Sequence, residues 1–366
     1  MLLKVLSERG ENIDVVAYPE GRNVTYNNVT LYRTIKVPGC NNVRPGFSVK
    51  KLVYDILMIF KVLQLTFHKK YDLIHAVEET SFIALLIKFL FKIPYVYDMD
   101  SSLAQQMVEK YPQLSPVKSV FNHFEGLAVK HAKAVVPVCQ ALANDIAEYN
   151  PKKVVLLTDV SLLKSNPDQL TEDLKQNLNI NNLLMMYVGN LESYQGIDLL
   201  LDSFAIALKQ TQQADLVIIG GEPGDIQFYQ QKAQQLGISD HIHFLGKKPT
   251  TELDTYLYQA DILVSPRTKG KNTPLKIYSY LDSGKAVLAT DLLTHTQVLN
   301  TEVAQLAAPD PEAFAQGMVN LIDNGTLRAK LGEAGKALVQ EKYSYTAFRQ
   351  QANRLYDELK QELLPN

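Results

Sequence analysis

The sequence predicts an α/β protein with two domains, each built on a parallel sheet with helices on both faces. The chain has 366 residues, enough for about two domains at roughly 150 residues each. Short, continuous apolar runs alternate with helical patterns along the whole chain, which is typical of parallel strands buried on both faces. A polar stretch at residues 164–182 interrupts the alternation and is expected to link the domains.

The composition excludes several classes of protein. Lys and Arg number 37 and Asp and Glu 39, a formal net charge of −2, whereas a dedicated nucleic-acid binder would carry a basic excess. Cys40 and Cys139 lie far apart and belong to no CxxC motif, so neither a disulfide framework nor a zinc site is expected. The content of hydrophobic residues, 46%, is that of an ordinary globular protein.

The first domain opens in the middle of an element. Residues 2–10 are typical of the end of an amphipathic helix stopped by a glycine, and residues 13–18 form a short apolar run that predicts a strand. Further strands are expected at 73–77, 95–97, 134–138 and 153–157, with helices at 49–68, 81–91, 116–132 and 140–149.

The second domain repeats the same rhythm. Several of its apolar runs end in Gly, Ser or Thr, which suits turns where a ligand approaches backbone N–H groups. Because the carboxyl ends of parallel strands share one edge of a sheet, we expect a ligand site at that edge. The expected strands are 184–189, 216–221, 242–246, 262–265 and 286–290.

Residues 49–70 permit two interpretations. Apolar residues recur at helical spacing with lysines between them, which fits either a core-facing helix with solvated lysines or a basic amphipathic helix at a membrane surface. The apolar run at 82–91 is too short to span a membrane and contains Lys88. No signal peptide is recognisable. The sequence therefore predicts a cytoplasmic protein, with peripheral membrane contact through 49–70 under the second interpretation.

The basic loop at residues 265–276 is the strongest local signal. It follows an apolar strand and precedes a helix, so it lies at the expected ligand edge. Cations beside a helix N-terminus suit a diphosphate, although a solvated basic loop would look similar. The residues concerned are Arg267, Lys269, Lys271, Asn272, Thr273 and Lys276.

Two glycine-containing junctions add weaker signals. Gly189 and Gly196 flank a polar loop that holds Asn190 and Gln195, and Gly221 follows a second strand. Neither junction has the GxGxxG spacing or a P-loop. After the last strong strand, Thr290, Thr294, His295 and Gln297 either belong to a ligand-binding loop or cap that loop.

Acidic residues follow two strands of the first domain. Asp98 and Asp100 come after the strand at 95–97, where they serve either a catalytic or ligand-binding role or as helix caps. Glu78 and Glu79 follow the strand at 73–77, where they bind ligand hydroxyls or are solvated. His75 lies inside that strand and is expected to be a hydrogen-bonded core residue.

Taken together, the junctions resemble the family 4 retaining glycosyltransferases (glycosyl transferases group 1) of the GT-B fold. The segments that carry the resemblance are GNLESYQGIDLLLDSFA, LVIIGGEPGDI, FLGKKPTTELDTYLYQADILVSPR and GKNTPLKIYSYLDSGKAVLAT. The resemblance implies two Rossmann-like, doubly wound domains facing across a cleft. Residues 1–164 would form the acceptor side and 165–344 the nucleotide-sugar side, and a helix in 345–366 would return to the first domain.

The resemblance implies transfer of a sugar from a nucleotide-diphosphate sugar to a saccharide or lipid-linked acceptor, with retention of configuration and without metal or cofactor. Departure of the diphosphate builds negative charge that positioned cations must stabilise. Asp98 and Asp100 are expected to be catalytic, and Glu78 and Glu79 to bind the acceptor. The expected donor-binding residues are Gly189, Asn190, Gln195, Gly196, Gly221, Arg267, Lys269, Lys271, Asn272, Thr273, Lys276 and Ser279.

The chain departs from the family pattern at several functional positions. The diphosphate-binding Arg and Lys of the family correspond to Asn190 and Gln195, its Glu pair to Lys271 and Ser279, and its cleft His to Asp100. We therefore hypothesise that the cations of the 265–276 loop bind the diphosphate instead. A nucleotide-sugar 2-epimerase of the same fold and a non-catalytic GT-B protein are the alternatives.

The resemblance also bears on the start of the chain. Family members usually begin with a strand and a glycine-containing loop before the helix that ends here at Gly10. The N-terminal domain is therefore expected to lack its first strand, and a start codon assigned roughly 30 residues late would account for this, the length of one strand plus most of a helix.

Overall fold

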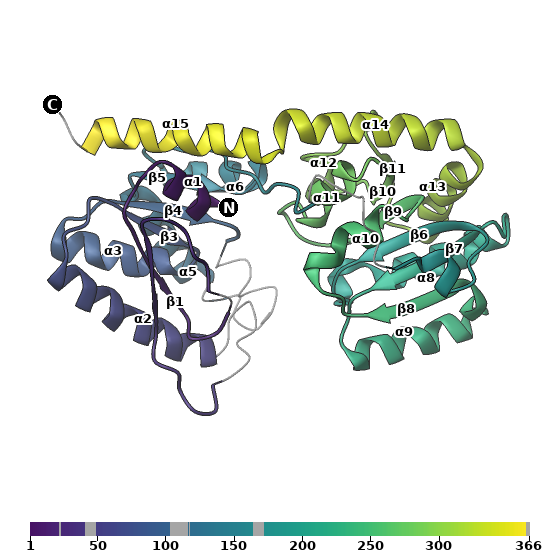
Figure 1. Ribbon diagram of the computed structural model, residues 1–366, viewed down its shortest axis with the longest axis horizontal. Coiled ribbons are helices and arrows are strands. Elements are labelled where there is room, and N and C mark those ends of the chain that lie inside the picture. Colours follow the sequence, from purple (N-terminus) through teal and green to yellow (C-terminus); the bar gives the residue numbers. More distant parts are fainter. Residues whose placement is uncertain (22, 41–48, 103–115, 117, 164–171, 364–366) are drawn as a thin grey trace. The chain divides into compact units, whose positions relative to one another are not determined.

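The computed structural model describes residues 1–21, 23–40, 49–102, 116, 118–163 and 172–363 (Figure 1). The chain divides into two compact units. The first comprises Met1–Thr158 and Phe348–Asn366, and the second Asp159–Ala347. Both are α/β with parallel strands, as the sequence predicts. Of the expected linker at 164–182, residues 164–171 lie outside the described residues.

The first unit contains a sheet of three parallel strands in the order β3 (Ile74–Val77), β4 (Tyr95–Met99) and β5 (Ala134–Pro137). A separate parallel pair is formed by β1 (Ile13–Ala17) and β2 (Val29–Arg33). The helices are α1 (Leu2–Glu8), α2 (Val49–His68), α3 (Thr80–Phe91), α5 (Lys118–His131) and α6 (Gln140–Asp145), the last continued by the 3-10 turn η2 (Ile146–Tyr149).

The strands of this unit differ from the sequence prediction in three places. β4 continues to Met99, because Asp98 pairs with Val77 on one side and Val136 on the other. The strand expected at 153–157 forms only an isolated bridge between Val154 and Val135 at the sheet edge. β2 was not predicted, since its residues are only partly buried and show no continuous apolar run.

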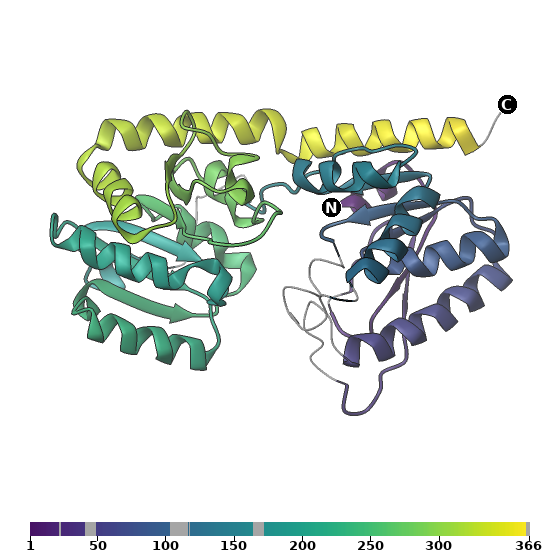
Figure 2. The ribbon, with the colours of Figure 1, turned by 180° about the vertical axis from the view of Figure 1, so that it is seen from behind.

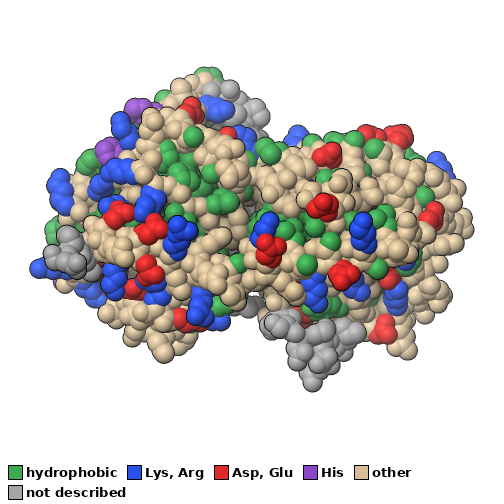
Figure 3. All heavy atoms as spheres, turned by 90° about the horizontal axis from the view of Figure 1, so that it is seen from above, with side chains coloured by type: hydrophobic (Ala, Val, Ile, Leu, Met, Phe, Trp, Pro, Cys, Tyr) green, Lys and Arg blue, Asp and Glu red, His purple; other side chains and the backbone are tan. Residues whose placement is uncertain are grey.

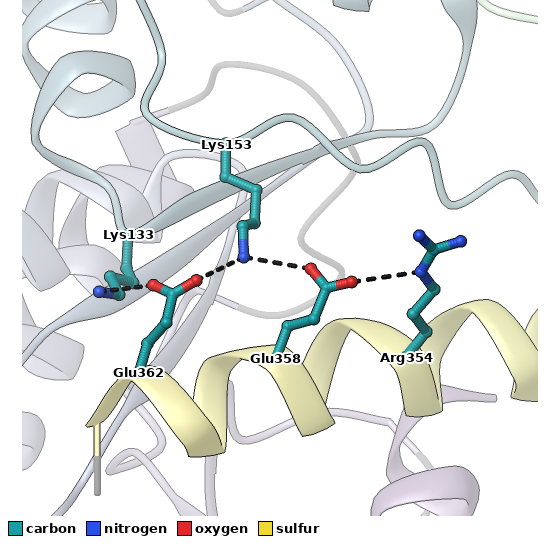
Figure 4. A network of polar contacts seen from close by, with 5 residues as sticks. All are labelled: Lys133, Lys153, Arg354, Glu358 and Glu362. Carbon is teal, nitrogen blue, oxygen red and sulfur yellow. Dashed lines mark hydrogen bonds and ion pairs between the residues drawn. The ribbon is translucent and has the colours of Figure 1, made fainter. Parts of the chain in front are cut away.

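The C-terminal helix α15 (Tyr345–Leu363) packs on the first unit from Phe348 onward. It buries Ala352, Leu355 and Leu359, which recur at helical spacing and so form one apolar stripe. Around this stripe, ion pairs join the helix to loops of the first unit (Figure 4).

The ion pairs centre on Glu362, whose carboxylate accepts hydrogen bonds from Lys133 at 2.7 Å and Lys153 at 2.6 Å. These bonds lower the pKa of Glu362 to about 2. Lys153 also reaches Glu358 at 3.1 Å. Side chains of both signs lie interspersed over the face seen in Figure 3, and exposed pairs of this kind each add little stability.

The second unit contains one parallel sheet of six strands. Its order is β11 (Gln305–Ala307), β10 (Ala286–Thr290), β9 (Ile262–Ser265), β6 (Leu183–Val188), β7 (Ala214–Ile219) and β8 (Ile242–Gly246). The helices are α7 (Leu174–Asn177), α8 (Ile197–Leu208), α9 (Pro223–Gln235), α10 (Leu253–Leu257), α11 (Lys276–Asp282), α12 (Leu293–Thr296), α13 (Pro311–Asp323) and α14 (Gly325–Lys342), with the 3-10 turns η3 (Ser193–Gln195), η4 (Ser239–His241) and η5 (Thr250–Glu252).

Both faces of this sheet are covered (Figures 1 and 2). Met185 and Tyr187 of β6 pack into a core with α8, α9 and α13. Leu184 and Met186 alternate with them and pack into a second core with α10, α11 and α14. Because successive side chains of a strand point to opposite faces, the two cores lie on opposite sides, and only the strand ends are left for a ligand.

Candidate functional site

Three loops meet at the carboxyl edge of the six-stranded sheet because glycines allow their backbones to touch. Gly196 is the N-cap of α8 and has φ +75°, and a Cβ there would lie 2.0 Å from the carbonyl oxygen of Pro266. Gly220 follows β7 at φ +118°, and a Cβ there would lie 2.0 Å from the carbonyl oxygen of Gly189. A Cβ at Gly221 would instead lie 2.5 Å from the Leu191 side chain. The turns after β6, β7 and β9 are therefore held against one another.

Lys276, the first residue of α11, places its ammonium group between these loops. Its Nζ donates to Gln195 Oε1 at 3.1 Å and stands 3.9 Å from the centre of the Tyr187 ring. Among the described residues it forms no ion pair with a carboxylate. Burial, and secondarily the charge of Arg267, hold the pKa of Lys276 well below its usual value. A buried ammonium group that has no carboxylate partner is stabilised by an anion that binds beside it.

Arg267 is largely buried and braces the basic loop from inside. Its Nε donates to the carbonyl of Lys269 at 2.6 Å, and a terminal nitrogen donates to Asn272 Oδ1 at 3.1 Å. Its guanidinium also lies 5.3 Å from the centre of the Tyr194 ring. A Cβ at Gly270, which has φ +117°, would collide with this guanidinium at 2.1 Å. Position 270 must therefore be a glycine, because the guanidinium of Arg267 occupies the space that a side chain would need.

His295 joins the ends of β9 and β10 beneath the loop. Its Nδ1 lies 3.0 Å from the carbonyl of Thr290, which only accepts, so Nδ1 carries the proton. Its Nε2 then accepts from Ser265 Oγ at 2.9 Å. The Thr290 hydroxyl donates to the carbonyl of Arg267 at 2.6 Å. Burial lowers the pKa of His295 to about 3, and the charges of Lys276 and Arg267 act in the same direction.

Two more side chains of this segment hold loop carbonyls. Thr294 Oγ1 donates to Asn272 O at 2.8 Å, and Gln297 Nε2 donates to Lys271 O at 2.6 Å. The sequence allowed these residues either to belong to a ligand-binding loop or to cap it, and the observed contacts are those of residues that cap and hold the loop. They stabilise the conformation in which Arg267 and Lys276 flank the first junction.

The remaining expected donor residues occupy different environments. Asn190 and Lys269 are exposed, Lys271 and Asn272 are partly exposed, and Thr273 is buried. The Asn190 amide turns back on its own loop, with Oδ1 accepting from Glu192 N at 3.3 Å. Ser279 is buried, and its Oγ accepts from Leu162 N at 3.1 Å. All of these lie in the second unit.

The residues expected to bind the acceptor lie in the first unit, at the carboxyl end of β3. Glu78 has a left-handed backbone, φ 52°, uncommon for a residue other than glycine. Its N–H donates to Asp98 O at 2.9 Å, and its Oε1 accepts from Ser101 Oγ at 2.6 Å. Burial raises the pKa of the Glu78 carboxyl, and the charges of Glu79 and Asp98 contribute.

Side chains of α2 approach the same edge. Glu79 forms an ion pair with Lys51, and the Tyr18 hydroxyl, just past β1, donates to Asp55. Burial raises the pKa of Asp55, and the charge of Glu79 adds to the shift. Tyr18, Lys51 and Asp55 could not be predicted from the sequence, because their proximity to β3 depends on how α2 packs rather than on any local motif.

The two aspartates expected to be catalytic have different positions. Asp98 lies inside β4, where its carboxylate binds His75 Nε2 at 2.9 Å. The other ring nitrogen of His75 lies 2.7 Å from the hydroxyl of Tyr356 on α15. His75 is therefore hydrogen-bonded, as expected, although only partly buried. Asp100 is exposed in the bend after β4. No metal-binding group of three His, Cys, Asp or Glu side chains occurs among the described residues.

Two family models match adjacent parts of the chain. Glycosyltransferase Family 4 matches residues 1–157, and Glycosyl transferases group 1 matches residues 168–338. The chain belongs to the family 4 glycosyltransferases. The second match covers the whole carboxyl edge built around Lys276 and Arg267.

Similar proteins support this assignment and the GT-B fold. An uncharacterized glycosyltransferase of Methanocaldococcus jannaschii is 23% identical over 97% of this chain and 92% of its own. A phosphatidyl-myo-inositol mannosyltransferase of Mycobacterium tuberculosis is 27% identical over 45% of this chain and 44% of its own. The structure of Anabaena HepE in complex with UDP and glucose superposes with a TM-score of 0.74, at 18% identity, over 98% of this chain and 95% of that one.

Proposed function

We propose that this glycosyltransferase transfers a sugar from a nucleotide-diphosphate sugar, bound at the carboxyl edge of the second unit, to a saccharide or lipid-linked acceptor with retention of configuration. The observation that carries the proposal is the ammonium of Lys276, which is desolvated, lacks a carboxylate among the described residues and lies beside Gln195. Family members carry a diphosphate-binding lysine at the position of Gln195. Here Lys276 brings a cation to the same place from another loop.

The electrostatics of this edge suit a leaving diphosphate. Negative charge grows on the diphosphate as the bond to the sugar breaks, and Lys276 and Arg267 are already held in position to stabilise it. Gly189, Gly196 and Gly221 allow the phosphates to approach the backbone. Because Arg267 also holds its own loop, we assign it both a charge role and a positioning role. The complex of HepE with UDP and glucose makes UDP-sugars the first donors to test.

On the acceptor side we propose that Glu78 and Glu79 bind hydroxyl groups. Asp100, exposed after β4, acts near the reacting hydroxyl, while Asp98 positions this edge through its bond to His75. The lipid-linked alternative for the acceptor is supported by the relative named as a phosphatidyl-myo-inositol mannosyltransferase. Residues 1–164 are thereby proposed as the acceptor side and 165–344 as the donor side.

Calorimetric titration with UDP tests the donor site directly. We expect Lys276→Met to weaken UDP binding by roughly thirtyfold, within the range for a lost charge-assisted hydrogen bond. Lys330→Met is the control, since Lys330 is an exposed cation of the second unit on α14, outside the basic loop, and its effect should stay below about threefold. Equal affinities in the parent chain and Lys276→Met would refute the assignment.

Product analysis separates the proposed reaction from its alternatives. A panel of nucleotide sugars is incubated with the full chain, with and without saccharide acceptors, and the anomeric configuration of the product is read by NMR. Acceptor-dependent release of the nucleotide supports transfer. Release without any acceptor would instead indicate an epimerase, and tight binding of a donor without turnover would indicate a non-catalytic protein.

A further inference from the structure

Helix α2 presents an apolar face that nothing in the described structure covers. Its opposite face packs on α3, with Met58 of α2 buried against Ile83 and Ile87 of α3. A surface helix normally carries polar residues on the side away from the core. Here that side carries Leu52, Ile56, Phe60 and Phe67, which are 48%, 47%, 65% and 73% exposed.

Helix α3 extends this face. Leu86, Phe89 and Leu90 of α3 are also exposed, and the Phe89 ring meets the His131 ring of α5 on one edge at 5.2 Å. The rings of Phe67 and Phe91 meet edge to face at 5.0 Å, so the end of α2 adjoins the end of α3. We call the seven exposed residues the α2–α3 apolar surface: Leu52, Ile56, Phe60, Phe67, Leu86, Phe89 and Leu90.

Cations lie where the two helices end. Lys69 and Lys70 follow α2, and Lys92 follows α3. Lys69 is paired with Asp14, whereas Lys70 and Lys92 are exposed. The helix dipole favours cations at C-terminal ends, but it does not account for exposed aromatic rings beside them. Aromatic side chains next to lysines are what an anionic lipid surface binds.

We propose that the α2–α3 apolar surface binds peripherally to an anionic lipid bilayer, with Phe60 and Phe67 entering the interface and Lys70 and Lys92 contacting lipid headgroups. No helix in the part of the chain that the structure describes is long and apolar enough to cross a membrane, so the contact lies along the surface. A second copy of the chain fits less well, because it would bring lysines of like charge together.

This inference goes beyond the sugar-transfer proposal and uses none of its residues. The helix is core-facing through Met58, and the proposal adds the membrane interpretation of residues 49–70 for its exposed apolar side. It also extends the contact to α3, which the sequence pattern did not suggest. A bound membrane would place a lipid-linked acceptor within reach, but the surface would bind lipid whatever the acceptor is.

Sedimentation of the full chain with vesicles tests the proposal. Binding is expected to vesicles of equimolar phosphatidylcholine and phosphatidylglycerol, and not to phosphatidylcholine alone. Phe60→Ser and Phe67→Ser should each weaken binding roughly tenfold. Phe228→Ser is the matched control, since Phe228 is 58% exposed on α9 of the second unit, and it should leave vesicle binding unchanged.

The lysines are tested in the same assay. Lys70→Gln and Lys92→Gln should each weaken binding about fivefold, and added salt should weaken it further. Lys330→Gln, an exposed position on α14, is the control. Circular dichroism and UDP affinity should match the parent chain in every variant, which separates failure of this proposal from failure of the donor site.

Three results would overturn the proposal. The first is absence of binding to anionic vesicles by the folded chain. The second is binding that Phe60→Ser and Phe67→Ser leave unaltered. The third is a self-association, seen by analytical ultracentrifugation without lipid, that Phe60→Ser abolishes, because the surface would then join two copies of the chain.

Discussion

The loops after β6 and β9 in the second unit and those after β3 and β4 in the first all end parallel strands, yet they carry opposite charge. The former place Arg267 and Lys276 beside glycine turns. The latter place Glu78, Glu79 and Asp100 beside hydroxyl groups and one lysine. Similar backbone architecture thus supports two kinds of chemistry, and the charge of the loop residues decides which.

This difference matches the two halves of the proposed reaction. A leaving diphosphate gains negative charge and requires cations, whereas an acceptor hydroxyl must lose a proton and is helped by carboxylates. Each edge has charged groups with shifted pKa values, downward for Lys276 and upward for Glu78. Perturbed pKa values of this kind concentrate at functional sites.

The largest effect on stability is expected from substituting a residue with positive φ, and each of the two edges has one: Gly196 and Glu78. Gly196→Ala places a Cβ 2.0 Å from the Pro266 carbonyl in a left-handed backbone, so it should lower the free energy of unfolding by about 3 kcal/mol and abolish UDP binding. Urea denaturation measures the loss.

Glu78→Gly is the counterpart, because there a left-handed residue becomes glycine. Relief of backbone strain offsets the lost hydrogen bond from Ser101, so the free energy of unfolding should change by less than about 1 kcal/mol. Turnover should nevertheless fall. A large destabilisation by Glu78→Gly would show that this edge is structural.

His295→Asn is expected to change both stability and its dependence on pH. The pKa of His295 is about 3 in the folded protein against 6.5 as its ordinary value, so the unfolded chain binds more protons between these limits. Its stabilising contribution is complete above pH 6.5 and is lost as the pH falls towards 3, by about 3 kcal/mol at pH 4.

The His295→Asn variant does not lose stability at low pH through this group. It also lacks the hydrogen bonds that His295 forms with Ser265 and Thr290. It should therefore be less stable than the parent by about 2 kcal/mol at pH 7, with a difference that shrinks or reverses near pH 4. Denaturant titrations at both pH values test this. Parallel stability curves would show that His295 is not the buried neutral base.

The two edges should respond to pH in opposite directions. Donor affinity is highest when Lys276 is protonated, so it should fall as the pH rises above its lowered pKa, by up to about tenfold per pH unit. Turnover with saturating donor should fall instead as the pH drops through the raised pKa of Glu78, because a protonated carboxyl accepts from a hydroxyl more weakly than a carboxylate does.

Glu78→Gln is expected to remove the acidic limb of the kcat profile while leaving the pH dependence of UDP binding unchanged. Titrations across pH, and in buffers that differ in ionisation enthalpy, report proton uptake by Lys276 on binding. Loss of both dependences in this single variant would contradict the assignment of separate groups to the two edges.

The local parts of this comparison could be read from the sequence, and the long-range parts could not. Apolar runs followed by polar turns place Glu78 and Lys276 at strand ends, because strand patterns are local. The contact of Lys276 with Gln195 joins residues 81 apart in the chain, and that of Tyr356 with His75 joins residues 281 apart. Such pairs depend on how the elements pack, which a hydrophobic pattern does not predict.

The position of Asp98 illustrates the same limit within a single element. Two more residues, Asp98 and Met99, carry β4 past Tyr97, although Asp is unfavourable in strands. The pairing of Asp98 with Val77 and Val136, together with its bond to His75, outweighs that preference. Local propensity therefore misplaced the end of the strand by two residues, and with it the surroundings of a proposed catalytic carboxylate.

The smallest effect is expected from Asn190→Ala, and it decides whether charge or hydrogen bonding dominates the donor edge. The family resemblance predicts that Asn190 stands at the position of a diphosphate-binding arginine, but its amide bonds within its own loop, to Glu192 N at 3.3 Å and the Tyr194 hydroxyl at 3.4 Å. These long bonds at an exposed site stabilise little, so UDP affinity should change by less than about twofold. Calorimetry beside Lys276→Met makes the comparison. A loss at Asn190 as large as that at Lys276 would mean that the diphosphate is bound by the first junction, and that the cations after β9 only brace it.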